Sequence, residues 1–245
     1  MSTLNLEKLS RGTIVAIGGG EIGRKKKLAD GTIKTYPIET TPIDQEIIRL
    51  SGKKNPKLLF IGTASDDSLA YIDAVHSHFG QSLGCWVDTL NLLSEMLPDA
   101  IIAEKILSAD IIYVGGGPKT RQMIDLWRKR GVDILLKRAL DKGCILSGLS
   151  AGACCWFEWV DTMDDVDDLN DLDLLPCLGI LKGIVVPHYN VLSTEEKSAI
   201  NQLLTEKGKT GYGIEECCAL VFTANGSYTI SSKEGASAFP IPASV

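Results

Sequence analysis

The sequence predicts one α/β domain over residues 1–245, with a mostly parallel sheet that helices cover on both faces. Three observations predict this class. Apolar, β-rich runs alternate with amphipathic helical stretches from one end of the chain to the other. The length of 245 residues and the hydrophobic content of 44% suffice to bury one large core. No stretch has the composition of a linker between two smaller domains.

The alternation of strands and helices is clearest in the first 150 residues. Predicted strands lie at 13–17, 57–61, 85–92, 110–114 and 144–147. A first helix is predicted to begin at Thr41-Pro42, and apolar spacing predicts a second over 69–79. Further helices are predicted at 98–107, 119–129 and 132–141. The first helix places Ile43, Ile47 and Leu50 at i, i+4 and i+7, the spacing of one buried helix face.

The pattern changes beyond Glu158. Seven aspartates fall between positions 161 and 173 among few apolar residues, which predicts a polar loop over the sheet. A calcium-binding loop also needs a central glycine and a terminal glutamate, and this segment has neither. Further strands are predicted at 184–186, 211–214, 219–222 and 228–231, and a helix at 194–207.

Charge and composition exclude several classes of partner. A net charge of −6 argues against nucleic-acid and anionic membrane surfaces, and the basic cluster at 24–27 is predicted to be a solvated loop. No apolar run approaches the roughly 18 uncharged residues of a membrane span, so we expect no membrane partner and a cytoplasmic location. The seven cysteines have no disulfide or zinc spacing and are expected to be reduced thiols that bind no metal.

The most informative motif is the G-x-S-x-G pentapeptide Gly148-Leu149-Ser150-Ala151-Gly152, which lies between an apolar run and a small-residue helix start. Glycines on both sides allow a strand to turn sharply into a helix, so that the serine hydroxyl stands clear of the backbone beside free N–H groups. Tight turns need small residues even where nothing reacts. The motif alone therefore leaves catalysis and packing equally open.

A serine nucleophile needs an imidazole to accept its proton, and the chain has three histidines. His76 and His78 lie two residues apart on a predicted helix, so they face different directions and are predicted to be surface or half-buried residues. His188 follows a buried strand and Pro187, at the strand end where sites gather in open α/β sheets. It is the candidate general base.

An acidic residue must orient that imidazole, and the sequence leaves two candidates open. Glu216, beside Glu215, closes the next predicted strand. Asp165, beside Asp164, lies in the polar loop between the serine and the histidine. Sheet topology favours Glu216, whereas closeness in sequence to the serine favours Asp165.

An acyl-transfer site also needs N–H donors for the developing oxyanion. Ala151 follows the candidate nucleophile, and Gly116 or Gly117 lies in the glycine turn after the strand at 110–114. These three residues are the predicted oxyanion donors.

The turn at 18–23 spells G-x-G-x-x-G, the dinucleotide-binding fingerprint. That fingerprint requires a helix to begin at the turn, because the helix N-terminus meets the pyrophosphate. Residues 24–42 instead contain charges, Asp30-Gly31 and two prolines, so we expect no nucleotide and no other cofactor.

Together these motifs resemble those of the peptidase E and cyanophycinase family of serine peptidases. The matching segments, in family order, are Ile17-Gly18-Gly19-Gly20, Gly115-Gly116-Gly117, Gly148-Leu149-Ser150-Ala151-Gly152-Ala153, Pro187-His188-Tyr189 and Gly213-Ile214-Glu215-Glu216. The resemblance implies a single three-layer α/β/α domain, similar to class I glutamine amidotransferases and flavodoxin-like in architecture. It implies Ser150 as nucleophile and His188 as base, with Glu216 or Asp165 as the third member.

The resemblance further implies a serine-type exopeptidase that hydrolyses a short, dipeptide-like substrate. Pro118 replaces the asparagine that peptidase E-like enzymes carry after the oxyanion glycines. Glu195 and Glu196 stand near the position of an arginine thought to read an N-terminal aspartate, so a preference for Asp-X dipeptides is not expected.

Three matters stay open from the sequence. The alternative function is a catalytically silent family member that binds a metabolite or a protein. An amidotransferase-like activity would need a thiol at the elbow, and Cys154 lies a full helical turn beyond it. The oligomeric state is undetermined, with a homodimer as one expectation.

Overall fold

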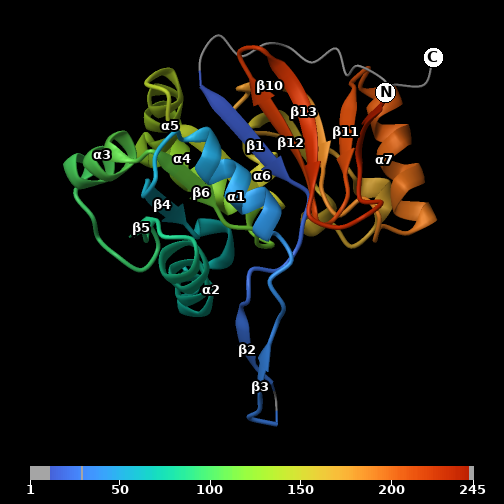
Figure 1. Ribbon diagram of the computed structural model, residues 1–245. Helices are drawn as coiled ribbons and strands as arrows, with labels where there is room; N and C mark the ends of the chain where they lie inside the picture. Colours follow the sequence, from blue (N-terminus) through green and yellow to red (C-terminus); the bar gives the residue numbers. More distant parts are fainter. Residues whose placement is uncertain (1–11, 29, 243–245) are drawn as a thin grey trace.

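A computed structural model describes residues 12–28 and 30–242 of the chain. Two sheets form the centre of the molecule, and a two-stranded arm extends away from it (Figure 1). The α/β class with three layers is confirmed. No helix in the described part of the chain combines the length and the apolar character needed to cross a membrane.

Seven strands form the larger sheet: β1 (Thr13–Ile17), β4 (Lys57–Ile61), β5 (Trp86–Leu90), β6 (Ile111–Val114), β7 (Ile145–Leu149), β12 (Cys218–Thr223) and β13 (Gly226–Ser231). Their spatial order is β13-β12-β1-β7-β6-β4-β5. Five neighbouring strands run parallel to one another: β1, β7, β6, β4 and β5. β12 pairs antiparallel with β1, and β13 pairs antiparallel with β12. All seven lie where apolar runs predicted them, so periodicity located this sheet correctly.

Helices cover both faces of the larger sheet (Figure 1). The helices are α1 (Thr41–Leu50), α2 (Leu69–Val75), α3 (Asp99–Ser108), α4 (Thr120–Arg130) and α5 (Val132–Asp141). α2 continues as a π-helical turn over His76–Ser82. Successive side chains of a strand point to opposite faces of the sheet. In β1, Val15 and Ile17 therefore pack with α1 and α2, whereas Ile14 and Ala16 pack with α3, α4 and α5.

A second sheet of five strands corrects the prediction of one sheet. Its order is β14-β11-β10-β8-β9. The strands are β8 (Phe157–Asp161), β9 (Leu174–Pro176), β10 (Leu181–Val186), β11 (Gly211–Ile214) and β14 (Ala238–Ile241), and α7 (Thr194–Glu206) packs on them through Ile200 and Leu204. The short helix α6 (Ala151–Cys154) explains the split. Residues 150–156 are too few for a crossover back into the larger sheet, which takes a dozen or more residues.

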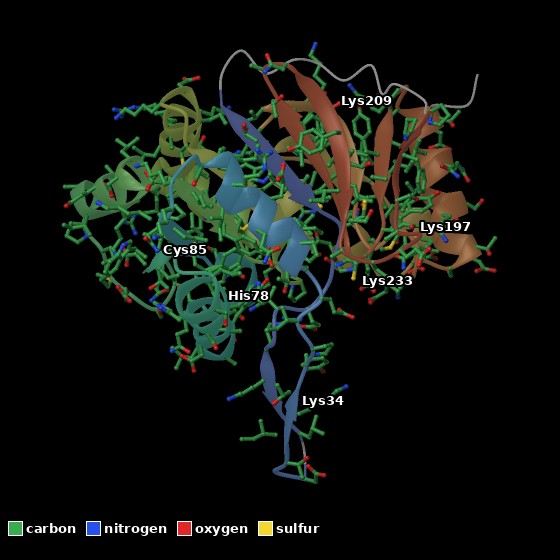
Figure 2. The ribbon with its side chains drawn as sticks, in the orientation of Figure 1. Lys34, His78, Cys85, Lys197, Lys209 and Lys233 are labelled. Carbon is green, nitrogen blue, oxygen red and sulfur yellow. The ribbon has the colours of Figure 1, made fainter. Side chains whose placement is uncertain are left out.

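The arm is an antiparallel hairpin of β2 (Lys25–Lys27) and β3 (Ile33–Thr35). The predicted solvated loop at 24–27 is therefore a strand, although Lys25 is exposed as expected. Ile33 is 68% exposed, and Lys34 marks the arm in Figure 2. An exposed two-stranded ribbon has little core of its own.

His78 is buried, contrary to the prediction of a surface or half-buried residue. Its side chain is 3% exposed, and its Nε2 lies 2.7 Å from Oδ2 of the fully buried Asp44. The Thr40 hydroxyl donates to the same oxygen at 2.7 Å. Burial raises the pKa of the Asp44 carboxyl, while the bonds from His78 and Thr40 act to lower it. The pair thus belongs to the core and not to the cavity described below.

Replacing Asp44 with alanine is expected to destabilise the fold by about 3 kcal/mol, because His78 and Thr40 would be left buried without their shared acceptor. Urea unfolding followed by circular dichroism measures this loss. Asp73→Ala, on the exposed face of α2, is the control and should change the stability by less than about 0.5 kcal/mol. Equal effects of the two substitutions would show that the buried pair has no special role.

Candidate active site

Ser150 lies at the sharp turn between β7 and α6. Its backbone has φ 55° and ψ −117°, a conformation that costs a non-glycine residue roughly 1–3 kcal/mol. A Cβ on Gly148 would lie 2.1 Å from the Gly152 carbonyl oxygen, and a Cβ on Gly152 would lie 2.2 Å from the carbonyl oxygen of Val114. Both glycines of the motif are therefore required by backbone contacts that hold the serine at the turn.

His188 follows β10 and also has a positive φ, of 53°. Its backbone N–H donates to the Gly18 carbonyl at 3.0 Å, which ties the histidine to the end of β1. A Cβ on Gly19 would lie 2.5 Å from the ring nitrogen Nδ1. The glycines at 18–20 thus make room for the imidazole, and the next helix, α1, begins only at Thr41. Over the described residues 18–28 and 30–40, no helix follows the G-x-G-x-x-G turn to hold a pyrophosphate.

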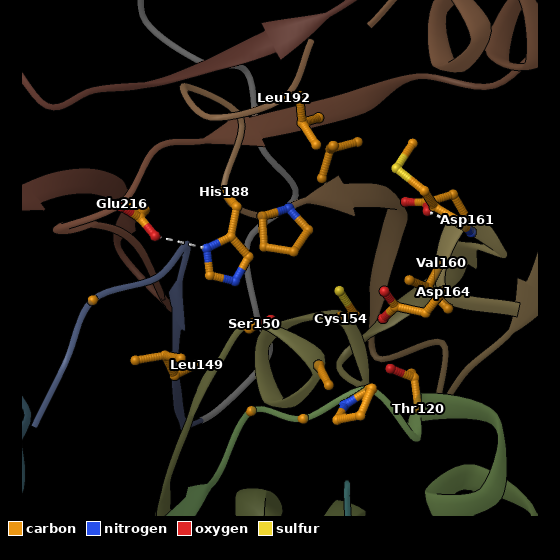
Figure 3. Close-up of a pocket in the computed structure, with 18 of the residues that line it drawn as sticks. Thr120, Leu149, Ser150, Cys154, Val160, Asp161, Asp164, His188, Leu192 and Glu216 are labelled. Atoms are coloured by element: carbon orange, nitrogen blue, oxygen red, sulfur yellow. Dashed lines mark hydrogen bonds and ion pairs between the residues drawn. The ribbon is translucent and has the colours of Figure 1, made fainter. Parts of the chain in front are cut away.

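The carboxylate beside the imidazole is that of Glu216. Nδ1 of His188 lies 3.2 Å from Oε1 of Glu216, and Figure 3 shows the other ring nitrogen on the side of Ser150. The Glu216 N–H donates to Oδ1 of Asn190 at 2.8 Å, which fixes the start of the turn after β11. Asn190 was not singled out in the sequence, although it lies two residues after the histidine.

Asp165 is placed differently from Glu216. Its Oδ2 lies 3.0 Å from Arg121, with which it forms an ion pair at the rim of the same cavity. The structure thus gives His188 a carboxylate partner in Glu216 and gives Asp165 a partner in α4. Of the two acids left open by the sequence, Glu216 has the geometry of an orienting residue.

Two of the predicted oxyanion donors, Ala151 and Gly116, lie next to Ser150. A Cβ on Gly116 would lie 3.1 Å from the Ser150 Cβ, so this turn touches the nucleophile turn. However, the Gly116 N–H already donates to the Tyr71 hydroxyl at 3.3 Å. Ala151 occupies the first position of α6, where N–H groups have no partner within the helix. Ala151 and Gly117 therefore remain as the backbone candidates.

One cavity of about 430 Å³ gathers these residues (Figure 3). Ser150, His188 and Glu216 line it together with the carboxylates of Glu21, Glu39, Asp161, Asp164 and Asp165. Arg24 also lines it, but Glu21 pairs with this guanidinium at 2.7 Å. Apolar side chains, among them Val160, Leu175, Leu192 and Ile200, complete the wall.

The segment predicted as a polar loop at 161–173 contributes three aspartates to the cavity wall, Asp161, Asp164 and Asp165. We call these three residues the acidic wall. Asp164 points into the cavity in Figure 3, and burial, followed by the neighbouring charge of Asp165, raises its pKa. Burial also raises the pKa of Asp161. Glu195 and Glu196, from which repulsion of a substrate carboxylate was predicted, do not line this cavity. The acidic residues that do line it from the segment 161–173 are the three of the acidic wall.

Cys154 lines the cavity at the end of α6, but burial raises the pKa of its thiol well above the usual range, so it is a poor thiolate nucleophile. Within residues 12–28 and 30–242, no three histidine, cysteine or acidic side chains gather in the way a metal site needs.

A serine at a strained turn, an imidazole paired with a carboxylate and neighbouring glycine turns define a serine hydrolase on an α/β scaffold. The model of peptidase family S51 matches residues 28–230. The chain belongs to this family and is a serine peptidase. The uncharacterized peptidase YgaJ of Bacillus subtilis (strain 168) is 33% identical over 230 residues, which cover 93% of this chain and 91% of YgaJ.

Two solved structures share the fold. A peptidase from an acI-B1 Actinobacterium has a TM-score of 0.69 and 19% identity, over 95% of this chain and 91% of its own. A candidate peptidase E protein from Listeria monocytogenes EGD-e has a TM-score of 0.67 and 20% identity, over 91% of this chain and 99% of its own. The resemblance seen in the sequence motifs is thereby confirmed at the level of the family and the fold.

Gly117→Ala is expected to lower kcat by about 10²-fold or more, because an added Cβ would lie 2.1 Å from the Ala64 carbonyl oxygen and the oxyanion turn would have to move. Steady-state kinetics with a cleaved peptide measures the effect. Gly80→Ala is the matched control, since its Cβ would meet no atom closer than 3.5 Å, and it should retain wild-type kcat. Equal activities of the two variants would contradict the assignment of the turn at 115–117 as a source of oxyanion donors.

Proposed function

We propose that this serine peptidase is an exopeptidase that hydrolyses short peptides through Ser150, His188 and Glu216. The observation that carries the proposal is the shared cavity, in which an imidazole with a carboxylate 3.2 Å from Nδ1 lies beside a serine on a strained turn. Glu216 keeps the proton on Nδ1, so Nε2 is free to accept the proton of the serine hydroxyl.

The reaction proceeds by acyl transfer. Oγ of Ser150 attacks the scissile carbonyl carbon while Nε2 of His188 takes the hydroxyl proton. The N–H groups of Ala151 and Gly117 bind the negatively charged oxygen of the tetrahedral intermediate. His188 then gives its proton to the departing amine. Water, deprotonated by the same nitrogen, attacks the acyl-enzyme and releases the carboxylate product.

The charges of the cavity support a substrate with a free α-ammonium group. Asp161, Asp164 and Asp165 line one side of the cavity, and the guanidinium of Arg24 is paired with Glu21. Such a wall attracts a cation and repels a side-chain carboxylate. A cavity of about 430 Å³ has room for a short peptide only. The proposed substrates are therefore small peptides with a free amino terminus and without an N-terminal aspartate.

A dipeptide library tests this proposal when each peptide is supplied with a free and with an acetylated amino terminus. Cleavage of free peptides, at least about tenfold faster than of their acetylated forms, is the expected result, since acetylation removes a charge pairing. Comparable cleavage of both forms would contradict the exopeptidase assignment. No turnover of any peptide, together with specific capture of a metabolite, would select the catalytically silent alternative.

A further inference from the structure

The hydroxyl of Tyr71 stands at the oxyanion turn, although nothing in the sequence marked it. Tyr71 lies in α2 and is 3% exposed, and its side chain lines the same cavity as Ser150, Gly116 and Gly117. Its Oη accepts the Gly116 N–H at 3.3 Å. Tyr71 therefore accepts the hydrogen bond of the Gly116 N–H, one of the groups that the sequence predicted as oxyanion donors.

A phenol carries one proton to donate besides the lone pairs with which it accepts. The Gly116 bond uses a lone pair only. Among residues 12–28 and 30–242, no side chain or carbonyl accepts the Tyr71 proton. Burial raises the pKa of Tyr71, so the phenol keeps this proton at neutral pH. A buried phenol on a residue that lines a cavity, with a proton that has no acceptor among the described residues, is available to a ligand.

The ring of Tyr71 has two packing partners, Arg24 and Phe60. The Arg24 guanidinium lies 5.0 Å from its centroid, and Arg24 is itself fixed by two bonds to Glu21 at 2.8 and 2.7 Å. Phe60 packs against the ring with a centroid distance of 5.1 Å. Arg24 acts to lower the pKa of the phenol, against the larger effect of burial, which raises it. The hydroxyl is thus preorganised, as an oxyanion donor must be.

We propose that Tyr71 is a catalytic residue whose O–H donates to the oxyanion of the tetrahedral intermediate, in place of the Gly116 N–H that it occupies. Gly116 links the two residues, because its N–H donates to the Tyr71 hydroxyl and a Cβ on it would lie 3.1 Å from the Ser150 Cβ. The donor set is then Tyr71 O–H with the N–H groups of Ala151 and Gly117. This inference rests on the proposed peptide hydrolysis by Ser150.

Tyr71→Phe is expected to lower kcat by about 10²-fold with little change in KM, because the lost bond forms only when charge develops on the oxygen. Tyr113→Phe is the matched control. Tyr113 is fully buried in the same core, does not line the cavity, and its hydroxyl has no partner among the described residues. Its loss should leave kcat unchanged. A wild-type kcat for Tyr71→Phe would overturn the inference.

A second variant separates donation to the substrate from mere support of Gly116. Incorporation of 3-fluorotyrosine at position 71 makes the phenol a stronger donor and a weaker acceptor. Donation to the oxyanion predicts a kcat at or above that of the wild type, measured below the pH at which the fluorinated phenol ionises. A kcat that falls toward that of Tyr71→Phe, with an unchanged melting temperature, would reduce Tyr71 to a positioning residue and overturn the proposal.

The failure of this inference is distinct from the failure of the proposed function. If Ser150→Ala abolishes peptide cleavage and Tyr71→Phe does not slow it, the hydrolysis by Ser150 stands and the role of Tyr71 falls. If Ser150→Ala cleaves peptides at the wild-type rate, the proposed function falls first, and the oxyanion assignment falls with it.

Discussion

Replacement of Ser150 by alanine is expected to lower kcat by at least about 10⁴-fold, because no other group at the turn between β7 and α6 can form the acyl-enzyme. The melting temperature should stay close to that of the wild type. The strained backbone is held by the contacts of Gly148 and Gly152 and not by the serine side chain. Peptide hydrolysis and thermal unfolding, measured on the same preparations, check both statements.

Ser147→Ala is the matched control for this variant. Ser147 lies on the same strand, is fully buried, and donates to the Ile112 carbonyl at 3.1 Å away from the cavity. Its loss should cost about 1 kcal/mol of stability and leave kcat unchanged. If Ser150→Ala retained most of the wild-type kcat, the assignment of Ser150 as the nucleophile would be wrong.

Glu216→Gln is expected to lower kcat by about 10³-fold or more, because an amide can donate to Nδ1 and so favour the wrong imidazole tautomer. Asp165→Asn should lower kcat by less than about tenfold, since Asp165 pairs with Arg121 and not with His188. Parallel kinetics of the two variants measure the contrast. A larger loss for Asp165→Asn would identify Asp165 as the orienting acid.

Much of the candidate site could be predicted because chemistry-bearing residues follow apolar runs. Ser150 comes directly after β7, which is buried along its length, and His188 comes two residues after β10, which is buried except at Lys182. The bond from the His188 N–H to the Gly18 carbonyl joins the ends of the two sheets. The glycine turns at 18–20 and 115–117 could be predicted because they too follow apolar runs. Their tight contacts, such as Gly19 against the His188 ring, show that glycine was needed there for close approach.

The choice of the acid could not be predicted, because it depends on which loop faces Nδ1. Both Glu216 and Asp165 line the cavity, and only the register between β10 and β11 places Glu216 beside the imidazole. The second sheet was missed for a similar reason, since strand periodicity does not say which sheet a strand joins. Tyr71 and His78 were missed because helical spacing marks apolar faces and gives no sign of polar partners buried beneath them.

Whether Ser150 and His188 act together is tested by reaction of the protein with a serine-directed fluorophosphonate, followed by peptide mapping of the adduct. We expect a single phosphonylated residue, Ser150, no adduct in Ser150→Ala, and labelling at least about 100-fold slower in His188→Ala. An adduct on any other residue, or equal labelling rates in the wild type and His188→Ala, would contradict the claim that these side chains act as one unit.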